Sequence, residues 1–218
     1  KTLFPYTTLF RSSKDIRYAE ELGYRVKLLG ITKHSGSGIE IRVHPTLIPE
    51  KRLIANVDGA MNAVVVKGDA VGPTLYYGAG AGAEPTGSSV IADLVDVARM
   101  QNTSIEERVP YLAYHDTTPT ANTPILPIGE ISTAYYLRMR ALDKPGVLAE
   151  VTKILGDRQI SIDAMMQKEP QDGETEADIV ILTHITVEKN MNAAIQAIEA
   201  LPAIDGAVVK LRMEELNK

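Results

Sequence analysis

The alternation of hydrophobic and polar positions divides the chain into two patterned regions, which a stretch rich in Thr, Pro and Asn separates. In the first region, residues 15–22 carry apolar side chains at helical spacing, and Gly23 follows as a natural stop. Apolar or alternating runs between turn residues then predict short strands. These strands are expected over residues 25–32, 39–44, 63–67 and 75–77.

Two further features of the first region affect its packing. The run Val64, Val65 and Val66 is typical of a strand buried on both faces. From Thr86 to Met100, apolar side chains recur at helical spacing, which predicts a long helix. We therefore expect the first region to be a mixture of strands and helices.

The separating stretch runs from about His115 to Glu130 and contains three prolines. Proline removes a backbone donor and clashes within a helix, so a helix or a central strand is excluded here. We predict a linker over 116–131, with one domain over 15–115 before it and another over 132–218 after it.

Beyond the linker, the pattern changes in the order strand, helix, strand, strand, helix, strand. The expected elements cover residues 135–141, 147–157, 160–167, 177–183, 191–201 and 207–213. This order predicts a ferredoxin-like βαββαβ unit, in which two helices back an antiparallel four-stranded sheet. Arg138 and Arg140 are expected on the outer face of the first strand. The inner face of the last strand is assigned to Ala207, Val209, Leu211 and Met213.

The first fourteen residues fit neither the helical nor the strand period cleanly. Both phenylalanines of the chain, Phe4 and Phe10, fall in this segment, and Pro5 breaks its short apolar stretch. A secretory signal peptide is therefore a poor interpretation. We expect residues 1–14 to be non-native or disordered; the alternative is an ordinary frayed terminus.

Composition and charge exclude several classes of function. The chain is 44% hydrophobic, has a formal net charge of -5 and contains no basic stripe with interleaved aromatics, which argues against nucleic-acid binding. Its longest apolar runs are far shorter than the roughly 20 residues that span a bilayer, so no membrane partner is expected. Cysteine is absent and the four histidines lack ligand spacing, so no metal site is expected. A cytoplasmic enzyme or regulator is the default expectation.

The loop between the first strand and first helix of the second region has the composition of a ligand site. Pro145 fixes φ, Gly146 permits close backbone approach, and the first amides of the helix can face a carboxylate. Asp143 could pair with an ammonium group, although a simple turn capped by Asp143 is the alternative. The candidate effector-binding residues are Asp143, Lys144, Pro145, Gly146, Val147, Ser161, Ile162 and Asp163.

The string from Leu142 to Leu148 within this βαββαβ order resembles the ACT domain. The resemblance implies binding of a free amino acid near this loop and pairing across a subunit interface. Some ACT domains act only in assembly, so a purely structural role stays open.

A glycine-rich segment joins the strand over 75–77 to the following helix. Alternating glycines expose backbone N–H groups, and the start of the helix adds the positive end of a dipole, so an anionic group could dock there. It is not a dinucleotide-binding fingerprint, and a tight turn between strand and helix is the alternative. The candidate cofactor-binding residues are Gly78, Gly80, Ala81, Gly82, Pro85 and Thr86.

The first region resembles homoserine dehydrogenase in a series of ordered matches. They are Asp15–Tyr24, Lys27–Gly30, Val43–Pro45, Val57–Gly59, Asn62–Val64 and Gly80–Thr86, with Asp93 further on. The resemblance implies an α+β fold, in which part of a catalytic domain, a mixed sheet with helices, precedes the ferredoxin-like ACT domain. It also implies that the segment 78–86 lies beside an NADP or NAD cofactor.

The resemblance further implies interconversion of L-homoserine and L-aspartate 4-semialdehyde, an effector such as threonine, and a homo-oligomer of two or more chains. In the family, the nucleotide-binding domain and the catalytic lysine and aspartate precede the segment that matches Asp15. Lys14 and Lys27 are not substitutes for that lysine. We therefore expect this chain alone to be inactive. The alternative is a non-catalytic amino-acid-binding ACT protein.

Overall fold

The computed structural model describes residues 13–101, 103–104, 123–168, 170 and 173–216. They form two compact units: residues 13–55 together with the described residues of 124–216, and the described residues of 56–123. The first twelve residues and residues 116–122 of the predicted linker lie outside the described part, as do Gln171 and Asp172, which with Gly173 form a sequence typical of a hairpin turn.

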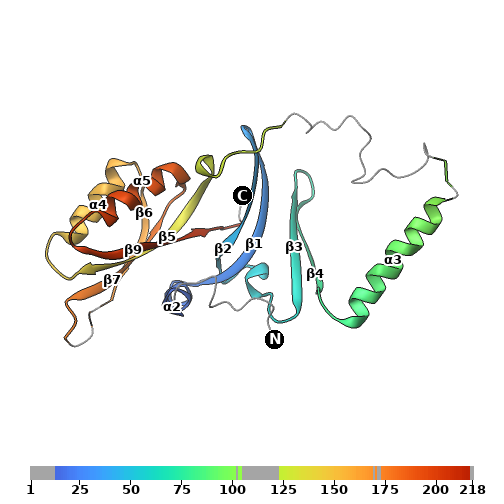
Figure 1. Ribbon diagram of the computed structural model, residues 1–218, viewed down its shortest axis with the longest axis horizontal. Helices are drawn as coiled ribbons and strands as arrows, with labels where there is room; N and C mark the ends of the chain where they lie inside the picture. The colour runs from blue at the N-terminus through green and yellow to red at the C-terminus, as the bar shows by residue number, and fades with distance from the viewer. Residues whose placement is uncertain (1–12, 102, 105–122, 169, 171–172, 217–218) are drawn as a thin grey trace. The chain divides into compact units, whose positions relative to one another are not determined.

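The larger unit contains the predicted βαββαβ order (Figure 1). Its four antiparallel strands have the order β9-β5-β7-β6. The elements are β5 (Ser132–Leu142), α4 (Val147–Asp157), β6 (Ile162–Gln167), β7 (Glu176–Thr183), α5 (Glu188–Glu199) and β9 (Ile204–Met213). The two-residue strand β8 (Thr186–Val187) pairs with the start of β5, and the short helix η4 (Ile128–Glu130) precedes it. The ferredoxin-like prediction is confirmed.

The two helices bury the apolar residues that their spacing predicts. Val147, Val151 and Leu155 of α4 are buried, as are Met191 and Ile198 of α5. They pack with one face of the sheet in a single core, to which the sheet contributes Tyr135, Leu137, Met139, Ala141, Ile179, Ile181 and Val208.

A hairpin from the first region extends this sheet. The hairpin consists of β1 (Tyr24–Ser35) and β2 (Gly38–Pro49) and follows the helix α2 (Ser13–Glu21). The strand β2 pairs in parallel with β9, aligning Thr46 with Arg212 and Leu47 with Met213. The sheet order becomes β1-β2-β9-β5-β7-β6. Strand β2 continues through Pro45, where the sequence predicted its end, because the fixed φ of proline is compatible with extended backbone.

The second face of the ACT sheet is also buried, which corrects two expectations. A second core on this face combines Tyr136, Val180 and Leu211 of the sheet with Leu47 of β2 and Ala19 of α2. Arg138 was expected on an outer face, but its side chain is only 14% exposed. In β9, the inner-face assignment is wrong: Leu211 and Met213 belong to this second core, Val209 is half-buried, and Ala207 is exposed.

The register of β9 gives the reason. Val209 aligns with Arg138 and Leu211 with Tyr136 of β5, so these residues share the face opposite the helices.

Helix α2 begins at Ser13, so Ser13 and Lys14 are helical rather than part of a segment outside the fold.

The smaller unit contains a hairpin and a helix. The hairpin comprises β3 (Met61–Gly68) and β4 (Gly72–Ala79), and the helix α3 covers Ala83–Gln101; the short helix η1 (Leu53–Asn56) precedes β3. The prediction of a buried valine strand is wrong for this chain, because Val64, Val65 and Val66 are 60%, 37% and 49% exposed. Within the described residues, α3 buries none of its side chains.

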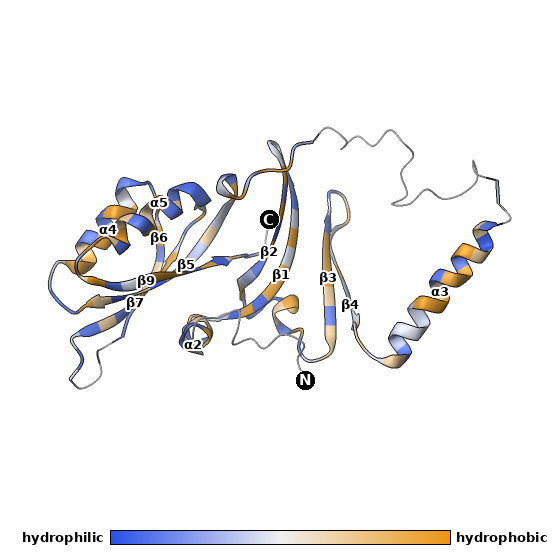
Figure 2. Ribbon diagram, in the orientation of Figure 1, coloured by the Kyte–Doolittle hydropathy of each residue, from blue (hydrophilic) through white to orange (hydrophobic). Residues whose placement is uncertain are grey.

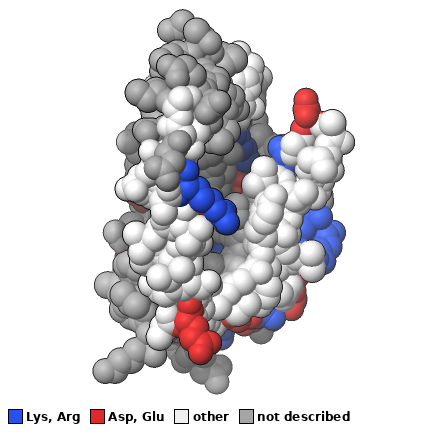
Figure 3. All heavy atoms as spheres, turned by 90° about the vertical axis from the view of Figure 1, so that its right-hand side faces the viewer, with Lys and Arg blue, Asp and Glu red and all other residues white. Residues whose placement is uncertain are grey.

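The exposed side chains of this unit are largely apolar. Figure 2 shows the hydrophobic positions along α3, which include Val90, Ile91 and Leu94. Figure 3, which faces the right-hand side of Figure 1, shows few charged side chains among the described residues. The valine run therefore identifies a strand correctly but not the contacts that would bury it. No helix in the described part of the chain is long and apolar enough to cross a membrane.

Candidate effector and cofactor sites

The loop from β5 to α4 has the conformation that the sequence predicts for Gly146. Gly146 is the N-cap of α4 and has φ +94°, in the left-handed region that favours glycine. A Cβ atom built on it would meet no heavy atom within 4 Å, so the requirement for glycine comes from the backbone rather than from crowding. Val147 is buried in the core and fixes the start of the helix, whereas residues 143–146 are exposed.

The Asp143 side chain is held by a neighbour that the sequence analysis did not identify. Its carboxylate Oδ1 accepts a hydrogen bond of 3.1 Å from Nε2 of Gln167, at the end of β6. The backbone N–H of Asp143 donates to the carbonyl of Thr175 at 3.0 Å. Helix α4 has no side-chain cap, so the alternative in which Asp143 caps the helix is not found. The exposed carboxylate is accessible to a ligand that could replace Gln167.

The remaining candidate effector residues lie at the other end of β6. Ile162 aligns with Thr183 of β7, whereas Gln167 aligns with Ile179, nearer the Asp143 loop. Four residues of extended strand separate Asp163 from Gln167, about 13 Å at the usual rise. Asp163 Oδ1 instead lies 3.8 Å from Nε2 of His184, and the carbonyl of Ser161 accepts from the His184 N–H at 2.9 Å. Within one chain, the predicted set therefore splits into two groups.

The glycine-rich segment links β4 to α3 and is solvent-exposed apart from the half-buried Pro85. The Gly80 N–H donates to the carbonyl of Ala60 at 3.2 Å, and a Cβ on Gly80 would lie 1.6 Å from Nδ2 of Asn62. Glycine at position 80 therefore allows the Asn62 side chain to pack closely against the backbone. Gly82 has φ +139° and accepts a hydrogen bond from the Thr86 N–H at 3.2 Å, at the start of α3.

The chemistry of this segment limits what part of a cofactor it could contact. Residues 78–86 contain neither lysine nor arginine. Gly78 is exposed, and a Cβ there would meet nothing within 4 Å, so a ligand could approach the backbone. The segment offers backbone N–H and carbonyl groups but no cationic side chain for a pyrophosphate. It fits the nicotinamide end of a dinucleotide, which carries no negative charge, better than its phosphates.

Comparison with known proteins gives two family matches and a set of close relatives. Residues 8–95 match the model of the homoserine dehydrogenase family, and residues 135–203 match that of the ACT domain. A crystal structure of a homoserine dehydrogenase from Thiobacillus denitrificans is 62% identical, with a TM-score of 0.86 over 97% of this chain and 47% of that one.

Two homoserine dehydrogenases known from sequence agree with this result. The protein from Neisseria gonorrhoeae is 56% identical over 94% of this chain and 47% of its own length. The protein from Methylobacillus glycogenes is 61% identical over 89% and 45%. The chain matches part of a homoserine dehydrogenase over nearly its whole length. It spans about half the length of the curated relatives it matches.

Helix α2 of the homoserine dehydrogenase match is bound to the ACT sheet through a buried ion-pair cluster that the sequence analysis missed. Asp15 is 1% exposed; its Oδ1 accepts from Nε of Arg138 at 2.6 Å and its Oδ2 from Nη2 at 3.1 Å. The hydroxyl of Tyr136 also donates to Asp15, at 2.9 Å. We call these residues, with Lys14, Tyr18 and Asp178, the α2 clasp.

The second half of the α2 clasp surrounds Asp178 of β7. Tyr18 donates to its Oδ2 at 2.8 Å and Lys14 at 3.2 Å. Burial alone would raise the pKa of Asp178, but these hydrogen bonds and the nearby cations outweigh it and lower the pKa. Burial, and then the Asp178 carboxylate, raise the pKa of Tyr18 to about 12. Asp178 is therefore ionised at neutral pH, and the clasp joins the segments of both family matches.

A second buried carboxylate lies in the first turn of α5. Glu188 is 2% exposed and accepts hydrogen bonds from Tyr135 at 2.6 Å, Lys210 at 2.5 Å and Arg212 at 2.8 and 2.9 Å. Burial would raise its pKa, but the hydrogen bonds from Arg212, Lys210 and Tyr135 lower it to about 2. This cluster ties α5 to β5 and to the part of β9 that aligns with β2. In the described ranges, no group of three or more acidic or histidine side chains could hold a metal ion.

Proposed function

We propose that the intact protein catalyses the NAD(P)-dependent interconversion of L-homoserine and L-aspartate 4-semialdehyde, and that an amino acid regulates it through the ACT domain. The observation that supports this most is the 62% identity to a homoserine dehydrogenase over 97% of the chain. The match covers both patterned regions, whereas a non-catalytic ACT protein, the alternative, would need only the second. The reaction transfers a hydride at the carbinol carbon of homoserine.

We propose that residues 78–86 form one wall of the cofactor site, beside the nicotinamide of NADP or NAD. The exposed backbone, the accessible Gly78 and the lack of a cationic side chain support this role. The catalytic lysine and aspartate are proposed to lie in the portion of the intact protein that precedes the match to Asp15. The proposed location is the cytoplasm.

We propose that the effector, with threonine as the first candidate, binds at the Asp143–Val147 loop. Its ammonium group would replace Gln167 beside Asp143, and its carboxylate would face the first amides of α4. An uncapped helix start beside an exposed carboxylate supports a zwitterionic ligand.

Pairing of two chains would complete this site. Strand β6 is at the end of the sheet order, and its edge is free among the described strands. Two copies that pair antiparallel along this edge would bring Asp163 of one chain toward Gln167 of the other. This arrangement supports a homo-oligomer of at least two chains, with the effector between them.

The activity is tested by comparing the intact protein with the 218-residue chain. The intact protein should reduce NADP or NAD with L-homoserine, and this chain alone should not, because the proposed proton-transfer groups lie outside it. The measurement is the initial rate of absorbance change at saturating homoserine. Turnover by the chain that survives repurification and disappears in a Gly80→Val variant would overturn the division of function proposed here.

A further inference from the structure

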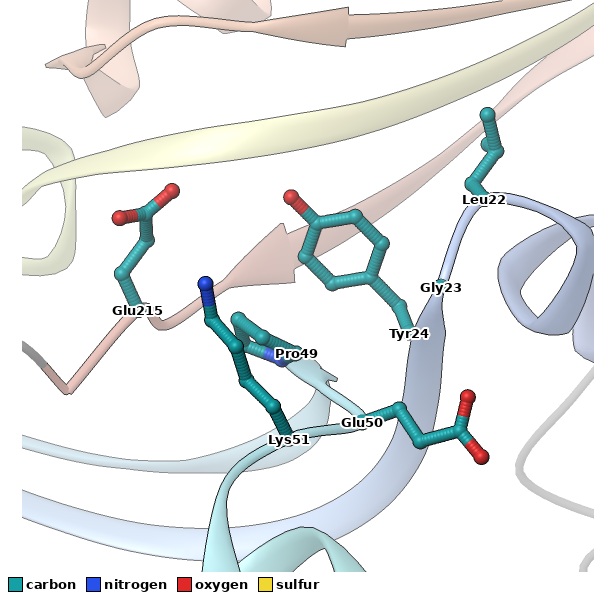
Figure 4. Close-up of a pocket in the computed structure, with 7 residues that line it drawn as sticks. All are labelled: Leu22, Gly23, Tyr24, Pro49, Glu50, Lys51 and Glu215. Atoms are coloured by element: carbon teal, nitrogen blue, oxygen red, sulfur yellow. The ribbon is translucent and has the colours of Figure 1, made fainter.

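A pocket of about 520 Å³ opens where three turns of the larger unit meet. Gly23 and Leu22 come from the connection of α2 to β1, Pro49 ends β2, and Glu215 follows β9. The N–H of Glu50 donates to the Gly23 carbonyl at 2.9 Å and ties two of these turns together. We call it the turn pocket; Figure 4 shows its lining residues, Leu22, Gly23, Tyr24, Pro49, Glu50, Lys51 and Glu215.

Three polar groups converge on the turn pocket. Figure 4 shows the side chains of Lys51, Glu215 and Tyr24 pointing toward the same space, whereas Glu50 points away. Glu50 pairs instead with Arg25 at 3.0 Å. Neither Lys51 nor Glu215 has an ion-pair partner in the part of the chain that the structure describes, and the two do not pair with each other. A cation and an anion therefore flank one pocket without neutralising each other.

The third group, the hydroxyl of Tyr24, stays protonated at neutral pH. Burial, followed by the carboxylates of Glu215 and Asp163, raises its pKa. It can therefore donate a hydrogen bond to an anionic ligand group. Tyr24 also packs in the second core, which fixes the ring while its hydroxyl faces the pocket.

This arrangement selects against simple ions. A free anion would meet Lys51 but also the repulsion of Glu215, and a free cation would meet the reverse. A molecule with both charges satisfies both groups. Leu22 and Pro49 add apolar surface, and the volume lies within the roughly 300–1,000 Å³ typical of small-molecule sites.

We propose that the turn pocket binds a small α-amino acid, with its carboxylate at Lys51 and the Tyr24 hydroxyl and its ammonium group at Glu215. The site is separate from the Asp143 loop and does not depend on it. It lies beside the junction of the β1–β2 hairpin with the end of β9, because the Glu214 N–H donates to the Leu47 carbonyl at 2.9 Å next to it. A bound amino acid would thus hold the hairpin against the last strand of the ACT sheet.

Calorimetric titration of the 218-residue chain with glycine, L-threonine and L-homoserine tests the proposal. Each charge-removing variant, Lys51→Met and Glu215→Gln, should weaken one binding event by about fivefold or more, since both groups are partly solvated. The matched controls Lys153→Met and Glu150→Gln, which remove exposed charges on α4, should not change it. N-acetylthreonine and threoninol, which each lack one charge, should bind more weakly than threonine to the parent chain.

The Asp143→Ala variant separates this site from the effector site, because it should leave the turn-pocket binding event intact. Loss of all binding in Asp143→Ala, with Lys51→Met and Glu215→Gln unchanged, would assign the ligand to the Asp143 loop and overturn the proposal. Absence of saturable binding of the three amino acids by the folded parent chain would overturn it as well. Retention of the fold in every variant is checked by circular dichroism.

Discussion

Gly146 shows how a single backbone conformation determines the start of a helix. Its φ of +94° lets the chain turn from β5 into α4, while the next residue, Val147, enters the core. Gly156, in the last turn of the same helix, has no positive φ and equal free space around a Cβ. Substitutions at the two positions therefore differ in backbone strain but not in crowding.

Replacing Gly146 with alanine should destabilise the chain by about 1–2 kcal/mol, because an L-residue is strained at positive φ. Gly156→Ala should instead stabilise it by about 0.5–1 kcal/mol, because alanine is favoured within a helix. Urea unfolding followed by circular dichroism measures both free energies of unfolding. Equal effects at the two positions would show that φ at Gly146 is not the reason for glycine.

Glu188 should make stability depend on pH in the acidic range. Its pKa is lowered in the folded chain from 4.5 to about 2, so its stabilisation is fully present above pH 4.5. It is lost as the pH falls from 4.5 toward 2, because the unfolded state then binds the proton more readily. The difference in unfolding free energy between the parent and Glu188→Gln, at most about 3 kcal/mol, should shrink over this range. The exposed control Glu150→Gln should show no such change; a difference that grows on acidification would be the wrong sign.

At the scale of elements, the α2 clasp illustrates that burial decides what an ion pair contributes. The Arg138–Asp15 contact of 2.6 Å and the Lys168–Glu21 contact of 2.5 Å both bind α2 to the ACT sheet. The first pair is 14% and 2% exposed, and the second 43% and 47%. Water screens the charges of the second pair. In the first pair, water cannot take the place of a missing partner, so the loss of either group leaves the other unpaired.

Asp15→Ala should therefore destabilise the chain by about 3–5 kcal/mol, since it leaves a buried guanidinium without its carboxylate. Glu21→Ala should cost about 0–1 kcal/mol, since it removes an exposed pair of similar length. In a double-mutant cycle, Asp15→Leu with Arg138→Met should cost less than the sum of the two single changes. Additive effects would mean that Arg138 and Asp15 do not depend on each other.

The sequence predicts an element correctly when the element packs against segments that follow the same local pattern. It does not predict which surfaces are covered by segments distant in the chain. Helix α4 occupies the predicted residues 147–157, because its apolar positions face a single core. Strand β9 has apolar side chains on both faces. The sequence does not reveal that α2 and β2 cover the face opposite the helices. The effector residues divide for a related reason: the sequence places Ser161–Asp163 at one strand, but only the register shows which end faces Asp143. Gln167 could have been identified from the topology. Strands β5 and β6 run in the same direction, so their last residues lie at the same end of the sheet.

At the scale of the whole molecule, the two family matches share a single sheet. Residues 13–55 form one compact unit with the described residues of 124–216, although the linker predicted from composition suggested a division at 116–131. The α2 clasp and the core around Tyr136 each contain residues from both matches, and the β2–β9 pairing joins the first match to the last strand of the βαββαβ unit. A change in the ACT sheet would therefore act directly on α2 and its hairpin. The proposed regulation needs such a connection, since catalysis and sensing are assigned to different portions of the chain.

Inhibition of the intact protein by threonine tests this account most directly. Homoserine-dependent reduction of NADP or NAD should be measured against threonine concentration in the parent and in Asp143→Ala, a residue outside the proposed catalytic machinery. We expect the parent to be inhibited, and the variant to keep its uninhibited rate while requiring roughly 10- to 150-fold more threonine, the effect of losing one charge-assisted hydrogen bond. Equal inhibition of both proteins, or an intact protein without homoserine-dependent turnover, would contradict the account.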